Sequence, residues 1–184
     1  MTWAQRTLSN VVVDARSAVI VPVAVPAAVE RVRDEHVPVA AAGVPPHVTL
    51  LSPFVPAARL DGTTRDRLSL AVAPIRPFEA SFAVIGRFPD ALYLAPEPDA
   101  EFRRLIAAVC GAFPAYPPYA EATYRPEDVV PHLTIAIGDG STFDDLASRL
   151  DSALPFTNRI DEVTVVAEGV DRRWHTRWKL PLRP

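Results

Sequence analysis

The chain has 184 residues, of which 49% are hydrophobic and 22% charged, and its formal net charge is -3. This composition excludes a disordered chain, and the length suffices for one sizeable core or two small lobes. The acidic balance argues against a broad basic surface for duplex nucleic acid, so an RNA end or a small nucleotide is the more suitable partner.

The single cysteine, Cys110, excludes an intramolecular disulfide and a site with several cysteine ligands. It fits a reducing compartment, so we expect a cytoplasmic protein, and we expect a monomer. Residues 1–10 lack a basic segment followed by an apolar one, and the longest apolar run is only about as long as a strand. The sequence therefore predicts no membrane partner.

The first half of the chain predicts the order strand, helix, strand, helix, strand, with prolines between the elements. The run 15–23 predicts a buried strand, and a helix from Pro26 to near Val37 follows. The charged helix residues that we expect to face water are Glu30, Arg31, Arg33 and Asp34. The run 44–54 predicts a strand and Asp61 caps a helix that ends near Ala73. The next strand is half-buried, with Phe78, Ala80, Phe82 and Val84 on one face.

The second half repeats this order. We expect a strand over 91–95, a helix from Asp99 to Gly111, a strand over 129–138, a helix from Ser141 or Thr142, and a strand over 160–167. A last strand, 174–182, has no counterpart in the first half. Its alternation places Trp174, Thr176, Trp178 and Leu180 on one face, and His175, Arg177 and Lys179 on the other.

Two similar segments, 85 positions apart, carry the strongest signal of duplication. His47 aligns with His132 and Thr49 with Thr134, while Val44, Pro46 and Leu50 meet Val129, Pro131 and Ile135. The economical interpretation is a single bilobal α+β domain over residues 1–184, built from pseudo-repeats at about 15–88 and 89–170 and the final strand.

The spacing His-x-Thr places the imidazole and the hydroxyl on the same face of a strand. If the lobes are related by a two-fold axis, two imidazoles and two hydroxyls surround one point. Histidine acts as base or acid near neutral pH, so the pair His47 and His132 suits an in-line displacement at phosphorus. Hydroxyls of Thr49 and Thr134 would donate to the phosphoryl oxygens, and the scheme requires no metal and no cofactor.

The two His-x-Thr motifs, one per half, resemble those of the 2H phosphoesterase superfamily. The run Pro-Pro-His-Val-Thr-Leu-Leu-Ser-Pro-Phe is similar to its bacterial 2'-5' RNA ligase-like branch. The resemblance implies an α+β fold in which two antiparallel sheets line a central cleft, with the helices outside. It also implies metal-independent chemistry on 2',3'-cyclic phosphates or 2'-5' phosphodiester bonds, with possible reversal to ligation, and it leaves open which histidine is acid and which is base.

Other candidates have weaker patterns. Arg177 is suited to a substrate phosphate, although a charged strand face is usually only hydrated. Aromatic residues that could stack on a base, but that more often anchor a core or loop, are Phe54, Tyr93, Tyr116, Tyr119 and Tyr124. We interpret His36 as structural and Cys110 as buried rather than nucleophilic.

Two alternatives remain. A hydrolytic metal site would have to gather His36, His47, His132 and His175, but no H-x-H or H-E-x-x-H spacing supports it. A protein of the same shape could also bind a nucleotide or a cyclic phosphate without turning it over. A pure binder has no use for two proton-exchanging groups, and a bell-shaped pH dependence of the rate would distinguish the enzyme.

Overall fold

The computed structural model describes residues 15–120 and 125–183. The strands in these residues are β1 (Ser17–Pro22), β2 (His47–Leu51), β3 (Phe78–Phe88), β4 (Ala91–Glu97), β5 (Leu133–Ile137), β6 (Phe156–Ile160), β7 (Glu162–Glu168) and β8 (Trp174–Pro181). The α-helices are α1 (Ala27–His36), α2 (Pro38–Ala41), α3 (Gly62–Val72), α4 (Asp99–Ala112) and α5 (Phe143–Leu150). None of the helices in the described ranges is long and apolar enough to cross a membrane.

The eight strands form one antiparallel sheet in the order β6-β3-β4-β5-β2-β1-β7-β8. Its two four-stranded halves meet at β5 and β2, where Val48 pairs with Leu133. The predicted α+β fold is confirmed. The two predicted sheets are the halves of this one sheet.

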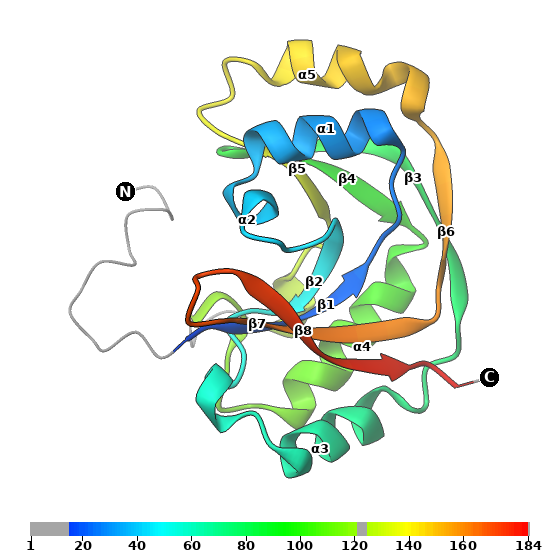
Figure 1. Cartoon of the computed structure of the whole chain (residues 1–184). Helices are drawn as coiled ribbons and strands as arrows, with labels where there is room; N and C mark the ends of the chain where they lie inside the picture. Colours follow the sequence, from blue (N-terminus) through cyan, green and yellow to red (C-terminus); the bar gives the residue numbers. More distant parts are fainter. Residues whose placement is uncertain (1–14, 121–124, 184) are drawn as a thin grey trace.

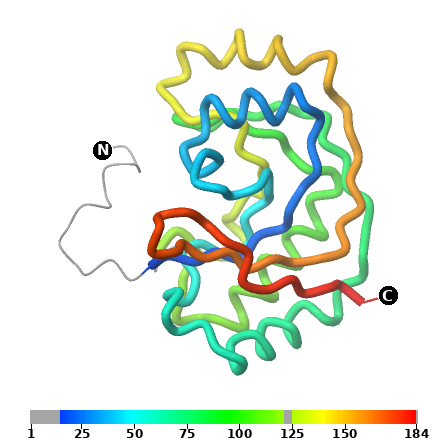
Figure 2. The backbone as a smooth tube through the Cα atoms, viewed as in Figure 1, coloured from blue at the N-terminus to red at the C-terminus, as the bar shows by residue number. Residues whose placement is uncertain are grey.

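The helices lie on the sheet in two groups, with α1 and α5 on one side of the molecule and α3 and α4 on the other (Figure 1). The backbone trace shows the same grouping, with α1 beside α5 although more than a hundred residues separate them (Figure 2). Helix α1 follows β1 but packs on β5, and α4 follows β4 but packs on β2. This reciprocal packing supports the proposed duplication.

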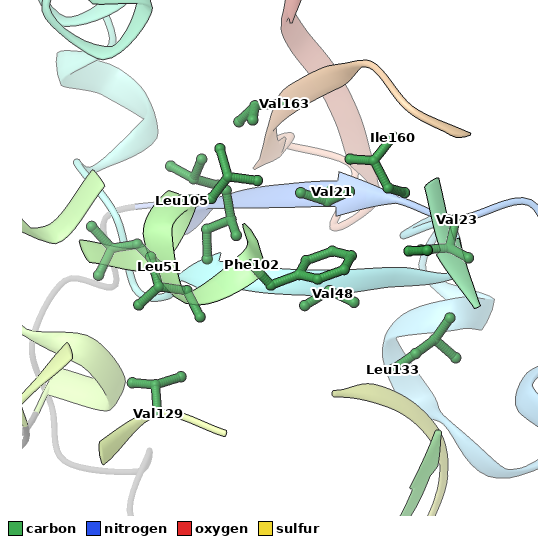
Figure 3. Packing of buried hydrophobic residues seen from close by; sticks show 14 of the residues in the cluster. Val21, Val23, Val48, Leu51, Phe102, Leu105, Val129, Leu133, Ile160 and Val163 are labelled. Carbon is green, nitrogen blue, oxygen red and sulfur yellow. The ribbon is translucent and has the colours of Figure 1, made fainter. Parts of the chain in front are cut away.

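The main core fills the space between the sheet and these helices. Phe102 and Leu105 of α4 lie beside Val21 of β1 and Val48 of β2 (Figure 3), and all four side chains are buried. On β5, Leu133 is buried in the same cluster. The residues that flank Val48 and Leu133 in the His-x-Thr motifs therefore lie on the opposite face of the sheet.

Most predicted elements begin and end within a few residues of their observed bounds. Asp61 is the N-cap of α3, since its carboxylate accepts a hydrogen bond of 2.8 Å from the Thr64 N–H. The predicted strand over 160–167 corresponds to β7, which begins two residues later, at Glu162. Strand β6, which was not predicted, ends at Ile160 and lies at one edge of the sheet, whereas β7 lies next to the other edge strand, β8. Helix α2 was not predicted, and its four residues contribute no buried side chain.

Two predicted alternations fail because a β-bulge shifts the strand by one residue. In β3 the register shifts between Phe82 and Val84, so Val84 is 62% exposed instead of sharing the buried face of Phe82. In β8 the register shifts at Arg177, so Trp178 packs on the main core while Trp174 packs on a smaller cluster around Ile20.

Candidate active site

The two His-x-Thr motifs lie side by side at the junction of the two sheet halves. Strands β2 and β5 are antiparallel, and Val48 is the partner of Leu133. Extending this register by one residue in each direction places His47 opposite Thr134 and Thr49 opposite His132. Directly opposed residues have Cβ atoms about 4.5 to 5.5 Å apart. Two cross-strand His–Thr pairs thus form a square of polar side chains on the face opposite the helices.

Each histidine ring is held in the same way by its own chain. The Nδ1 atom of His47 lies 2.7 Å from the Pro45 carbonyl oxygen, and that of His132 lies 2.7 Å from the Val130 carbonyl oxygen. A carbonyl only accepts, so each neutral ring carries its proton on Nδ1 and presents the lone pair of Nε2. No described residue forms a hydrogen bond with either Nε2 atom. Both rings are therefore prepared to exchange a proton at Nε2.

Burial favours the neutral form of both rings. The pKa of His47 is lowered to about 4, mainly by loss of hydration on burial and further by the positive charges of Arg33 and His132, while the hydrogen bond to the Pro45 carbonyl acts in the opposite direction. Burial also lowers the pKa of His132, opposed by its bond to Val130. A phosphate bound between the rings would act in the other direction, because a nearby negative charge favours the imidazolium.

A β-bulge follows the threonine in both motifs. Thr49 pairs with Ile20 and Leu51 with Val19, so Leu50 is the extra residue on β2. Thr134 pairs with Tyr93 and Ala136 with Leu92, which makes Ile135 the extra residue on β5. The bulge lets each chain keep its threonine on the polar face while the two following residues are buried.

Tyr93, a predicted substrate-binding residue, lies next to one of the histidines. It is opposite Thr134 on β4, and its ring centroid is 5.5 Å from that of His132. It stacks on Phe88 at 4.4 Å and crosses Gly86, where any Cβ would overlap the ring. Phe88 also contacts His132 edge-on at 5.1 Å. Phe88 was missed by the sequence analysis, which ended the third strand at Val84.

Arg33 is the second residue that the sequence analysis missed, and the prediction that it faces water is wrong. It lies on α1, is 2% exposed, and donates from Nη2 to the Pro45 carbonyl at 3.1 Å. That carbonyl is the one that holds His47. Its sequence neighbours are charged, so no pattern in the chain indicated that this one side chain turns inward.

The remaining candidates differ in their position relative to the four motif residues. Phe54 is 2% exposed and packs edge-on against Phe113 at 4.8 Å and beside Tyr116, so it is a core residue with no ring face for a base. Arg177 is exposed on the edge strand β8. Tyr119 is 46% exposed and lines a small depression with Thr49, Ser52 and Pro118. Tyr124 lies outside the described residues.

The other two histidines have local partners, and the one cysteine is buried. His36 lies 3.7 Å from the carboxylate of Glu35, and His175 lies 3.2 Å from that of Asp171. Burial raises the pKa of the Cys110 thiol to about 11, which leaves it protonated and unreactive near neutral pH. No group of three or more His, Cys, Asp or Glu that could hold a metal is found in residues 15–120 and 125–183.

The fold agrees with solved structures of low sequence identity. E. coli LigT complexed with NADP+ superposes with a TM-score of 0.54 at 19% identity, covering 93% of this chain and 99% of LigT. The protein TT0787 of Thermus thermophilus gives a TM-score of 0.55 at 19% identity, covering 91% and 98% of the two chains. A structure described as a phosphoesterase gives 0.52 at 16% identity, covering 92% and 99%. A comparison with curated protein sequences found no match.

The family is shown by sequence. Residues 21–172 match the family model of the 2'-5' RNA ligase superfamily, and this range includes both His-x-Thr motifs and Tyr93. It confirms the family that the motifs resemble. The chain belongs to the 2'-5' RNA ligase superfamily.

Proposed function

We propose that the protein is a phosphoesterase that acts on 2',3'-cyclic phosphates or 2'-5' phosphodiester bonds of RNA or nucleotides. The observation that carries this proposal is the square of two opposed His–Thr pairs, in which both rings are fixed at Nδ1 and present Nε2. Membership of the 2'-5' RNA ligase superfamily supports the substrate class.

The reaction is an in-line displacement at phosphorus. For hydrolysis of a cyclic phosphate, one Nε2 accepts a proton from water as its oxygen forms the new P–O bond. The other Nε2 donates a proton to the ribose oxygen as its P–O bond breaks, so the second proton transfer balances the first. The hydroxyls of Thr49 and Thr134 donate to the nonbridging oxygens, where negative charge increases in the transition state. In this scheme the two histidines move both protons without a metal or a cofactor.

Ligation is the same displacement with a different attacking group. If an RNA 5'-hydroxyl replaces water as the attacking group, the same two proton transfers open the cyclic phosphate and form a phosphodiester. The 2'-5' linkage results when the 3'-oxygen is the leaving group. Hydrolysis and ligation therefore use one site, and the competition between water and RNA 5'-hydroxyls decides which product forms.

The residues around the square suggest how the rest of the substrate lies. Tyr93 is opposite Thr134 and beside His132, so we assign it a contact with the nucleotide on that side. Arg177 is exposed and has no ion pair among the described residues, which keeps it as a candidate contact for a longer RNA. A net charge of -3 favours a short substrate over a long one. We further take the protein to be a cytoplasmic monomer.

The second candidate function is binding of a nucleotide or a cyclic phosphate without turnover. The same four side chains would hold a phosphate, and NADP+ bound to the E. coli LigT structure shows that a relative of this fold takes a nucleotide. Fixing both imidazoles by their Nδ1 atoms serves proton transfer at Nε2, and a binder gains little from it. The geometry therefore favours the enzyme.

The test is a substrate panel incubated with and without EDTA. Nucleoside 2',3'-cyclic monophosphates and 2'-5' linked oligoadenylates are incubated with the wild type and with the His47→Ala/His132→Ala double variant, and the products are separated by chromatography. We expect turnover by the wild type that the double variant lacks, and the product isomer identifies the bond that is cut. Binding without turnover would support the second candidate, and turnover that EDTA abolishes would refute the metal-free scheme.

A further inference from the structure

Arg33 is a buried cation next to the proposed site. It is 2% exposed, and the bond to the Pro45 carbonyl is the one hydrogen bond that its side chain makes to a described residue. No carboxylate in the described residues forms an ion pair with it, although Glu30 and Asp34 lie on the same helix. Burial lowers the pKa of its guanidinium, which these two carboxylates oppose. Arginine still keeps its charge in proteins, so this cation is permanent.

The charge of Arg33 acts on His47 through a shared carbonyl. The Pro45 oxygen accepts from Arg33 at 3.1 Å and from His47 Nδ1 at 2.7 Å, so the two nitrogen atoms are within about 6 Å of each other. Besides Arg33, His132 on β5 is the charged or titratable group that acts on His47. Helix α2 has no titratable side chain. On β1, the residue paired with His47 is Pro22. Protonated His47 would thus face one permanent cation and a second histidine.

The second half of the molecule lacks this arrangement. His132 is held by the Val130 carbonyl, whereas Arg103 of α4 donates to the carbonyls of Val129 and Glu127 at 3.2 Å. Arg103 is also paired with Asp99, at 2.7 Å from Nε to the carboxylate. Arg103 is therefore paired with a carboxylate, and it bonds carbonyls other than that of Val130, which holds His132. The two histidines have the same geometry but different electrostatic surroundings.

We propose that Arg33 is a positioning residue that keeps His47 unprotonated, so that His47 is the base and His132 the acid in hydrolysis of the cyclic phosphate. This inference rests on the proposed function. His47 Nε2 takes the proton of the attacking water as the P–O bond to water forms. His132 Nε2 gives its proton to the ribose oxygen as the bond from phosphorus to that oxygen breaks. In ligation the two roles are unchanged, because the attacking hydroxyl stands in the place of water.

The directions of the pKa shifts agree with this assignment. The pKa of His47 is lowered by burial first and then by Arg33 and His132. The lowering at His132 has burial as its cause, without a contribution from an arginine. A single proton shared by the site would therefore reside on His132.

The test is an NMR titration of the histidine Hε1 signals without substrate, in the wild type and in Arg33→Met, Arg33→Lys and Arg103→Met. His47→Gln and His132→Gln assign the signals. In the wild type we expect His47 to titrate at lower pH than His132. Two charges at this separation repel by the equivalent of about 0.5 to 2 pH units, so Arg33→Met should raise the His47 midpoint by that amount. Arg33→Lys keeps the cation and should restore most of the wild-type value, and Arg103→Met should leave it unchanged.

The outcomes separate this inference from the proposed function. A His47 midpoint that equals or exceeds that of His132 in the wild type overturns it without need of a variant, and so does an Arg33→Met midpoint that does not move. In activity assays, the acidic limb of kcat/KM should move to higher pH in Arg33→Met and stay in place in Arg103→Met. Turnover with an unmoved midpoint refutes the role of Arg33 alone. A shifted midpoint in a protein that turns over nothing refutes the proposed function and the catalytic roles with it.

Discussion

At the scale of single residues, the proposed chemistry depends on where each proton is. Nδ1 of both histidines is occupied by a backbone carbonyl two residues earlier, so the position of the catalytic nitrogen is set by the chain itself. The His-x-Thr spacing alone predicted the four polar side chains. It did not predict Arg33, because the inward turn of one charged residue among several depends on how α1 packs in three dimensions.

Lowering the pH is expected to destabilise the fold through His47. Its pKa is about 4 in the folded chain and near 6.5 when unfolded, so the unfolded chain binds the proton more tightly within this window. Stability is complete above about pH 6.5 and falls as the pH decreases toward 4, by at most about 3 kcal/mol from this residue. Urea unfolding near pH 7 and near pH 4.5 measures it. His47→Asn should lose less stability on acidification, and equal losses in the two proteins would contradict the shift.

Thr49→Val is expected to slow the reaction less than loss of a histidine does. Valine keeps the branched shape of threonine but has no hydroxyl, so one hydrogen bond to a charged phosphoryl oxygen is lost. Such a bond corresponds to about tenfold or somewhat more in kcat/KM. Thr49→Ser keeps the hydroxyl and is the matched control. If the serine and valine variants lost the same activity, the hydroxyl would have no role.

At the scale of elements, β-bulges decide which side chains reach the site. Bulges at Leu50 and Ile135 follow the two threonines, and a third at Arg177 separates the faces of Trp174 and Trp178. A period of two in the sequence predicts the strands but not these shifts, because a bulge depends on pairing with the neighbouring strand. This is why the alternation failed at Val84 although the strand itself was predicted.

Gly86→Ala is expected to disturb the His132 side of the site. A Cβ at this position overlaps the Tyr93 ring, which packs against Phe88 and His132. We expect a loss of about 1 to 3 kcal/mol in the free energy of unfolding, and a lower kcat/KM as His132 loses its support. Gly111→Ala is the control, since nothing lies within 4 Å of that Cβ and alanine favours a helix. A Gly86→Ala protein as stable and active as the control would show that Tyr93 does not position His132.

At the scale of the whole molecule, the two halves depend on each other for their cores. Helix α1 packs on β5 and α4 packs on β2, so the apolar face of each helix is covered by the other half of the chain. The spacing of the motifs predicts a duplication. The packing of α1 on β5 and of α4 on β2 was not predictable, because the periodicity of a segment shows which of its faces is buried but not which other segment covers that face.

A chain cut after the first half is expected not to fold alone. Residues 15–88 contain Val29 and Val32 of α1, which are buried in the full chain and would be exposed without β5. Circular dichroism and amide NMR spectra of the 15–88 and 89–184 pieces, alone and mixed, measure this. Folded spectra from either piece alone would contradict the interdependence of the halves, and a folded mixture would support it.

The most direct measurement is kcat/KM of His47→Ala and His132→Ala, each alone, on the best cyclic or 2'-5' linked substrate in EDTA. Thermal unfolding of each variant verifies that the fold is intact. Each histidine moves a proton in the transition state, so each single variant should lose at least about a hundredfold. A folded variant of either histidine that keeps nearly full activity would contradict the two-histidine mechanism.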